Sequence, residues 1–128
     1  MRVAARVWTA DANAAYARLE RARTLNRLSS QPDLLAGAIA ARLGDYPMMD
    51  AAFTRAARRN PSDWYAHLEL AVVATHFSQP RRARRELAIA RRLNPREPAL
   101  TIVQAAIRAG EPVDQAALDR MFLERTRV

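Results

Sequence analysis

Residues 56–61 read Ala56-Ala57-Arg58-Arg59-Asn60-Pro61, and residues 90–95 read Ala90-Arg91-Arg92-Leu93-Asn94-Pro95. The two Asn-Pro pairs are 34 residues apart (94 − 60 = 34), and similar residues precede each pair. One more step of 34 residues back leads to Leu19, Ala22 and Asn26, where Arg27 replaces the proline. A fixed period of this length indicates stacked structural repeats.

The composition favours an all-α fold in one domain of 128 residues. Half of the residues are hydrophobic, but 28 of them are alanine and only 6% of the chain is aromatic. Alanine is the best helix former, and small side chains fill a core only when helices pack closely. No stretch shows the period-two alternation of a strand. We therefore expect close helix-on-helix packing.

Periodicity and breakers predict about seven helices, at residues 11–28, 34–43, 47–59, 64–77, 81–93, 97–109 and 113–125. Ser30 and Asp33 predict a capping box around Pro32. Gly44 predicts a left-handed helix end. Gly37 lies inside a helix, where it costs about 1 kcal/mol relative to alanine, so we expect another helix to come very close there; Ala71 is expected at a second close crossing.

The chain carries a formal charge of +8, and all 21 basic residues are arginine. Such a charge suggests an acidic partner, but arginine and alanine without lysine are also typical of a GC-rich genome. The cluster of Arg81, Arg82, Arg84 and Arg85 is either a solvated outer helix face or a surface that binds an anionic polymer. The stacking aromatics of nucleic-acid binders are not interleaved with it, so we expect no nucleic-acid partner.

No arrangement typical of catalysis or metal binding is present in the sequence. The chain has no cysteine, which excludes disulfides and thiolate sites. His67 and His76 are nine residues apart on one expected helix, so they point to opposite sides and cannot share a metal ion. No glycine-rich phosphate loop occurs. We expect a protein that is not an enzyme and has no cofactor.

The longest uncharged run, residues 70–80, is far shorter than the roughly 20 residues of a membrane span. Residues 1–6 include two arginines but no apolar run follows them, so no signal peptide is predicted. We therefore expect a soluble chain.

The 34-residue unit resembles the tetratricopeptide repeat. Residues 30–63 carry the family's pattern at Gly37, Gly44, Tyr46, Phe53, Ala56 and Pro61, and residues 64–97 carry it at Leu70, Ala71, Ala83, Leu87, Ala90 and Pro95. Residues 11–29 match half a repeat, and residues 98–128 match a degenerate repeat with a capping helix. The resemblance implies an α-solenoid of antiparallel helix hairpins that serves as a non-catalytic scaffold for protein–protein interaction.

In that family the first helix of each repeat lines a groove that receives a peptide or a helix. The resemblance places the groove at Arg42, Tyr65, Leu68, Glu69, Val72 and His76. The basic pattern that clamps a C-terminal carboxylate is absent. This implies an apolar or helical ligand, or a terminal helix of the same chain in the groove.

The two ends of the stack need cover as well, because repeat units cannot bury their faces alone. We expect the helix at 113–125 to cap the C-terminal end. Trp8 and Tyr16 are expected to lie exposed at the N-terminal end, where self-association would occur.

A second resemblance is to the soluble C-terminal repeat regions of actinobacterial membrane proteins of the O-antigen ligase type. It rests on Leu25-Asn26, Pro32, Gly37, residues 43–45, residues 61–64 and residues 93–95. It implies a soluble domain of an envelope protein whose chemistry lies outside this chain, with a membrane helix before residue 1. The compartment is then either the bacterial cytoplasm or the soluble side of the envelope.

Overall fold

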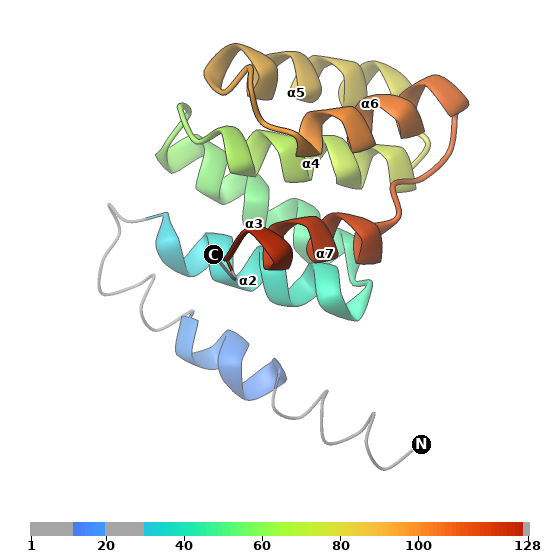
Figure 1. The fold of residues 1–128 in the computed structure, drawn as a ribbon. Helices are drawn as coiled ribbons and strands as arrows, with labels where there is room; N and C mark the ends of the chain where they lie inside the picture. The colour runs from blue at the N-terminus through green and yellow to red at the C-terminus, as the bar shows by residue number, and fades with distance from the viewer. Residues whose placement is uncertain (1–11, 20–29, 127–128) are drawn as a thin grey trace, which may run out of the picture. The chain divides into compact units, whose positions relative to one another are not determined.

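The computed structural model describes residues 12–19 and 30–126, with side chains up to residue 124. These residues form seven helices and no strand, which confirms the all-α expectation. A helix at 12–19 is followed by α2 (Gln31–Leu43), α3 (Tyr46–Arg59), α4 (Trp64–His76), α5 (Pro80–Leu93), α6 (Ala99–Ala109) and α7 (Gln115–Thr126) (Figure 1). Within the described part of the chain, no helix is both long and apolar enough to cross a membrane.

The chain divides into two compact units, Met1–Asn60 and Pro61–Val128. The division falls between Asn60 and Pro61, at the first of the two repeated Asn-Pro pairs. In the first unit α2 packs on α3, and in the second α4 packs on α5, so each expected helix hairpin is present.

The repeat is visible in the local backbone. Asn60 ends α3 with φ −137° and ψ 85°, and its N–H donates to the carbonyl oxygen of Ala56. Asn94 ends α5 with φ −146° and ψ 75°, and its N–H donates to Ala90. The proline after each asparagine keeps that residue out of the helical region, so equivalent sequence produces equivalent helix ends.

The hairpin of α2 and α3 is built around Gly37 and Phe53. Phe53 is fully buried, and a Cβ added at Gly37 would lie 2.6 Å from two atoms of its ring. The close crossing expected at Gly37 is therefore confirmed. Gly44 ends α2 with φ 69°, as the sequence predicts. The Asp45 side chain then accepts a hydrogen bond from the amide of Met48 at the start of α3.

The predicted capping box at Ser30 and Asp33 is wrong. Ser30 makes no side-chain hydrogen bond at the start of α2. Asp33 is buried and pairs instead with two arginines one turn apart on α3, at 3.0 Å to Nε of Arg55 and 3.3 Å to Nε of Arg59. A buried carboxylate needs charged donors more than a helix end does, and the antiparallel hairpin supplies them.

The second unit is organised around α4. Nine consecutive residues of α4, from Ala66 to Ala74, are buried, so this helix has no solvated face over that length. The helices α5 and α6 pack on α4 and on each other (Figure 1). The buried residues of these two helices are small or branched, namely Ala83, Leu87, Ala90, Ala99, Leu100 and Val103.

His67 ties the loop before α4 to α5. Its Nε2 lies 3.0 Å from the carbonyl oxygen of Pro61, which can only accept, so Nε2 carries a hydrogen and donates it. Its Nδ1 lies 2.8 Å from a carboxylate oxygen of Glu86 on α5. Both ring nitrogens of this buried side chain are therefore engaged in holding the fold.

We expect His67→Ala to lower the free energy of unfolding by about 1–3 kcal/mol, because two partly buried hydrogen bonds are lost and the half-buried Glu86 loses its partner. Urea unfolding followed by circular dichroism measures this. His67→Gln, which can still donate to Pro61, should lose less. Equal losses in the two variants would show that ring packing and not hydrogen bonding is what matters at this position.

Candidate functional site

The α4 residues of the expected groove share one helix face, which we call the α4 face: Tyr65, Leu68, Glu69, Val72 and His76. Their spacing of three and four residues places them in one row. Leu68, Glu69 and Val72 are at most 1% exposed, while Tyr65 and His76 are half-buried. These three side chains are therefore covered in this chain, and the groove itself, filled by a ligand or by a terminal helix of the same chain, stays a prediction. Arg42 is exposed on α2, in the other unit.

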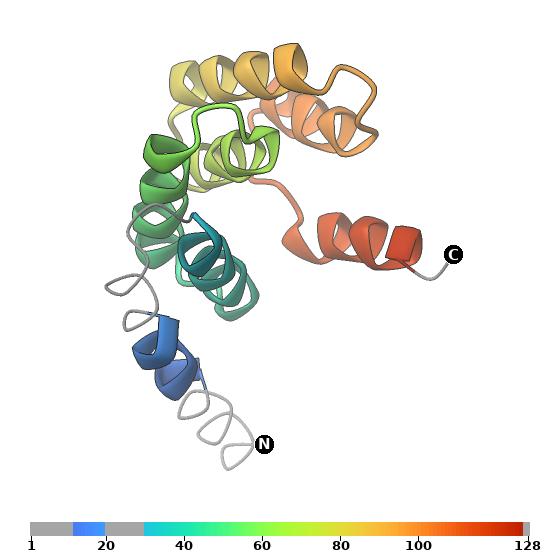
Figure 2. The ribbon, with the colours of Figure 1, turned by 90° about the vertical axis from the view of Figure 1, so that its left-hand side faces the viewer.

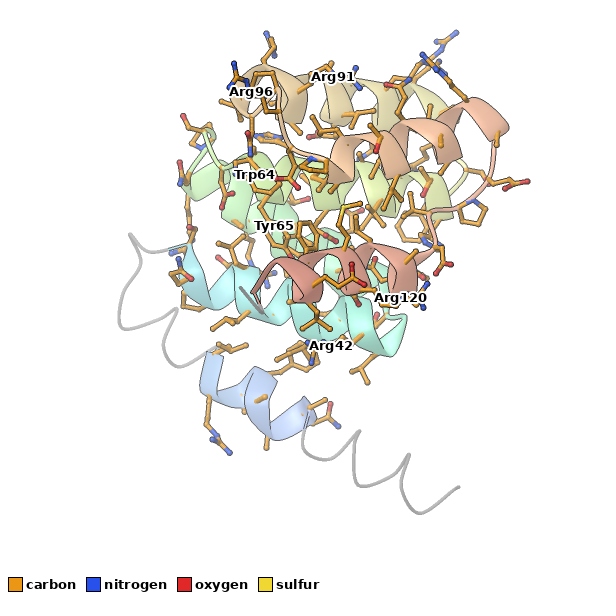
Figure 3. The ribbon with its side chains drawn as sticks, in the orientation of Figure 1. Arg42, Trp64, Tyr65, Arg91, Arg96 and Arg120 are labelled. Carbon is orange, nitrogen blue, oxygen red and sulfur yellow. The ribbon has the colours of Figure 1, made fainter. Side chains whose placement is uncertain are left out.

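The C-terminal part of the chain lies against the α4 face. At one end of α4, the amide of Val113 donates to Oγ1 of Thr75 at 3.1 Å. The carbonyl oxygen of the same Val113 accepts from Nε2 of His76 at 2.9 Å. At the other end, the rings of Tyr65 and Phe122 meet edge to face, with centroids 5.8 Å apart (Figure 3). Because Val113 meets the end of α4 and Phe122 meets its start, α7 runs antiparallel to α4.

The last helix, which was expected to cap the C-terminal end of the stack, packs on α6 and also reaches α4 through Phe122. Residues 110–114 lead away from α6 and carry the chain to α7 (Figure 2). The helix α7 packs on α6, and its Phe122 contacts Tyr65 of α4, while the hydrogen bonds to the end of α4 come from Val113 just before α7. The alternative that a terminal helix of the same chain fills the groove therefore fits the geometry.

Few buried side chains attach α7 to the rest of its unit. Among residues 115–124, Leu118 is the one fully buried side chain, while Met121 and Phe122 are half-buried and Leu123 is 53% exposed. Val113, just before the helix, is also buried. Burying one or two aliphatic side chains contributes about 2–5 kcal/mol to the binding of α7 to the rest of the unit. A core helix buries a whole row of apolar side chains and is held by a much larger free energy.

Two buried acceptors lie in this interface. Among the described residues, no donor reaches Oε2 of Glu69 or Oε1 of Gln115. The amide group of Gln115 instead donates to Oδ1 of Asp119 at 3.0 Å. Burial, together with a smaller contribution from the negative charge of Asp119, raises the pKa of Glu69 to about 8. At pH 7 Glu69 is therefore mainly protonated.

His76, at the other end of the α4 face, is held neutral. Burial lowers the pKa of His76, and its hydrogen bond to the Val113 carbonyl opposes this in part. A carbonyl only accepts, so the neutral ring carries its hydrogen on Nε2. His67 and His76 bind different partners, and within the described residues no group of three histidines or acids is arranged to hold a metal ion.

The arginines of α5 form the most basic surface. Arg81, Arg84 and Arg85 are exposed, whereas Arg82 is half-buried and donates to Oε1 of Gln79 at 3.1 Å. Arg91 and Arg96 are also exposed and lie on the side of the unit away from α7 (Figure 3). Three of the four predicted cluster residues thus point to solvent.

Tyr16, expected at an exposed N-terminal end, is half-buried within its own unit. It lines a cavity of about 60 Å³ together with Leu19, Pro32 and Met48. Burial raises the pKa of its hydroxyl group, and the charge of Asp45 adds to this. Trp8 lies outside the described residues. Tyr16 therefore packs against residues of its own unit and is not exposed as expected.

A second cavity, of about 280 Å³, lies where α4 turns into α5 and α6 ends, and no sequence pattern predicted it. Its walls include Thr75, Pro80, Ile107 and Pro112. Ser78, which also lines it, has φ 54°, a left-handed conformation that is uncommon outside glycine.

Sequence reasoning missed Gln115 and Asp119 as parts of the site. The one available signal was their i, i+4 spacing next to the apolar positions of residues 113–122. No protein-family model, no curated protein and no solved structure matches this chain. The function is therefore argued from the α4 face and its cover.

Proposed function

We propose that this chain is a tetratricopeptide-like interaction module that binds a protein or peptide partner through the α4 face. The observation that carries this proposal is that the face already receives the C-terminal segment of the chain: Tyr65 contacts Phe122 of α7, and His76 binds the carbonyl oxygen of Val113 just before α7. The tetratricopeptide-like architecture is supported by the matching ends at Asn60 and Asn94.

In this proposal α7 occupies the binding surface until a partner helix replaces it. Occupation by a tethered segment lowers the apparent affinity for any external ligand, because the segment is present at high effective concentration. The thin attachment of α7 makes replacement feasible. An external helix with a complete apolar stripe would bury more surface than α7, in which Leu118 is the one fully buried side chain among residues 115–124.

We expect Leu118→Ala to increase partner capture about tenfold or more, because a core leucine-to-alanine change costs about 2–5 kcal/mol and this loss falls on the α7 contact. The full chain is used as bait in an extract of the native organism. A photoreactive phenylalanine analogue replaces Tyr65, so that only a partner on the α4 face is cross-linked. The matched control is Leu123→Ala, the same change at an exposed position of α7, which should leave capture unchanged.

Two outcomes would contradict the proposal. One is a partner that purifies with the chain but never cross-links from position 65. The other is equal capture by Leu118→Ala and Leu123→Ala, which would mean that α7 does not compete with the partner.

The exposed arginines of α5 favour a second candidate, the binding of an anionic polymer. We rank it lower and expect nucleic acid to bind weakly and to dissociate near 150 mM salt, since scattered arginines make few simultaneous phosphate contacts. Filter binding across a salt series measures this. Submicromolar binding at that salt concentration would reverse the ranking if it were lost on changing Arg81, Arg82, Arg84 and Arg85 to Gln. In that case, binding should be kept when four exposed arginines elsewhere are changed to Gln as a control, namely Arg42, Arg58, Arg108 and Arg120.

A further inference from the structure

Two side chains, Glu69 on α4 and Gln115 on α7, each have a buried oxygen without a hydrogen-bond partner among the described residues. Glu69 is buried, and its Oε2 has no donor among the described residues. Asp119 brings a further carboxylate close enough for its charge to act on Glu69. The amide group of Gln115, a donor from α7, is already used on Asp119, and its own Oε1 is left without a donor in the described part of the chain.

Such an arrangement is unusual for a permanent interface. Buried polar groups in folded proteins are nearly always hydrogen-bonded, and each unsatisfied one costs about 1–3 kcal/mol. Two carboxyl groups from facing helices add a like-charge conflict whenever both are ionised. The helix α7 therefore matches the apolar ends of the α4 face but not its polar centre.

We propose that the α4 face takes an amphipathic partner helix that presents a lysine or arginine side chain where α7 presents Asp119, and that Glu69 pairs with this cation. The inference rests on the proposed function and names the partner's chemistry at that site. A buried carboxylate is stable when a cation and its hydrogen bonds replace the lost water, and a charged donor forms a stronger bond than a neutral one. The rest of the partner's contact is apolar and aromatic, as for Val113 and Phe122.

The chemistry of the face favours a cation over a neutral or acidic residue. An acidic residue reproduces the conflict that α7 shows. A neutral donor satisfies one oxygen of Glu69 but leaves it protonated, whereas an ammonium or guanidinium group allows it to ionise and to accept several bonds. Because α7 presents Asp119 and not a cation to Glu69, it binds the α4 face more weakly than such a partner would. The partner's cation forms the ion pair with Glu69 that α7 cannot form.

The test uses synthetic peptides that copy residues 113–126, with Asp119, Asp119→Asn or Asp119→Lys. Their binding to the full-length Leu118→Ala protein, in which α7 is loosened, is measured by fluorescence anisotropy at pH 7. We expect the Asp119→Lys peptide to bind about tenfold tighter or more than the native peptide, with Asp119→Asn between them. In the protein that also carries Glu69→Gln, the preference should fall to about twofold or less.

A charge control is built into the series. A peptide with Glu124→Lys carries the same change in net charge at an exposed position of α7, and it should bind like the native peptide. The full-length protein with Asp119→Lys should hold its own α7 more firmly and bind every peptide more weakly than the parent does.

The peptide measurements have three outcomes that contradict a proposal. Peptides that bind without a preference for Lys, or a preference that survives Glu69→Gln, would overturn this inference and leave the proposed function standing. A Glu124→Lys peptide that gains as much as Asp119→Lys would also overturn it, because net charge would then explain the gain. If no peptide binds to the loosened protein, the α4 face does not receive a helix in trans and the proposed function fails with it.

Discussion

The free energy of unfolding should fall as the pH rises from about 4.5 to about 8, and Glu69→Gln should remove most of this fall. Glu69 has a pKa of about 8 in the folded protein, against the ordinary value of 4.5 that it takes when the chain is unfolded. Below pH 4.5 it is protonated in both states, and no difference arises. Between the two values only the unfolded state releases its proton, so unfolding becomes progressively easier. Above about pH 8 the loss is complete.

The size of this effect is large for a small domain. A difference of about 3.5 pKa units corresponds to about 5 kcal/mol at 1.36 kcal/mol per unit, and this is an upper limit because detachment of α7 would rehydrate Glu69 before the whole unit unfolds. Typical domains have only 5–15 kcal/mol in total. Glu69→Gln keeps the shape without the titration, so at pH 8 the variant should be the more stable protein.

Urea unfolding at pH 4.5, 6 and 8 measures this effect, with Trp64 fluorescence as the reporter of the second unit. Trp8→Phe in every protein removes the other tryptophan. Glu124→Gln, an exposed change on α7, is the control and should keep the parent's pH dependence. If the Glu69→Gln protein shows the same slope between pH 4.5 and 8 as the parent, another group causes it and Glu69 is ionised in the fold.

Gly37→Leu should destabilise the hairpin of α2 and α3 by about 3 kcal/mol. Helix propensity alone predicts the opposite sign, because leucine is favoured over glycine by about 0.8 kcal/mol inside a helix. The tertiary contact outweighs this gain. A Cβ at residue 37 would lie 2.6 Å from ring atoms of the fully buried Phe53, and overpacking of this kind costs about 1–3 kcal/mol or more.

Further variants distinguish overpacking against Phe53 from a general sensitivity of α2 to substitution. Urea unfolding followed by circular dichroism should show a smaller loss for Gly37→Ala, and Phe53→Leu should rescue part of it by making room. Ala51→Leu, at an exposed position of α3, is the control and should be nearly neutral. A neutral result for Gly37→Leu would mean that the two helices can move apart at little cost.

Much of the local structure could be predicted from the sequence. The Asn-Pro pairs end α3 and α5 as expected, and Gly44 ends α2 in the left-handed conformation. These are short-range effects, since proline and glycine restrict or extend the backbone wherever they occur. Gly37 was also predictive, because a glycine retained inside a helix indicates a close neighbour.

Other features depended on residues far apart in the chain. Asp33 looked like part of a helix cap, yet its partners Arg55 and Arg59 come from the facing helix, 22 and 26 residues later (55 − 33 and 59 − 33). A capping pattern specifies which groups are near in sequence, but a buried carboxylate takes the strongest donors that the fold provides.

The sequence by itself determined the helices, their ends and the apolar face of α4. Only the tertiary structure decided that Val113 and Phe122 contact this face, that Glu69 lies buried in it, and that Asp119 comes near. The physical reason is that periodicity shows which side of a helix avoids water but not which other segment provides the cover. The cost of burying Glu69 arises only when a specific neighbour excludes water and brings its own charge.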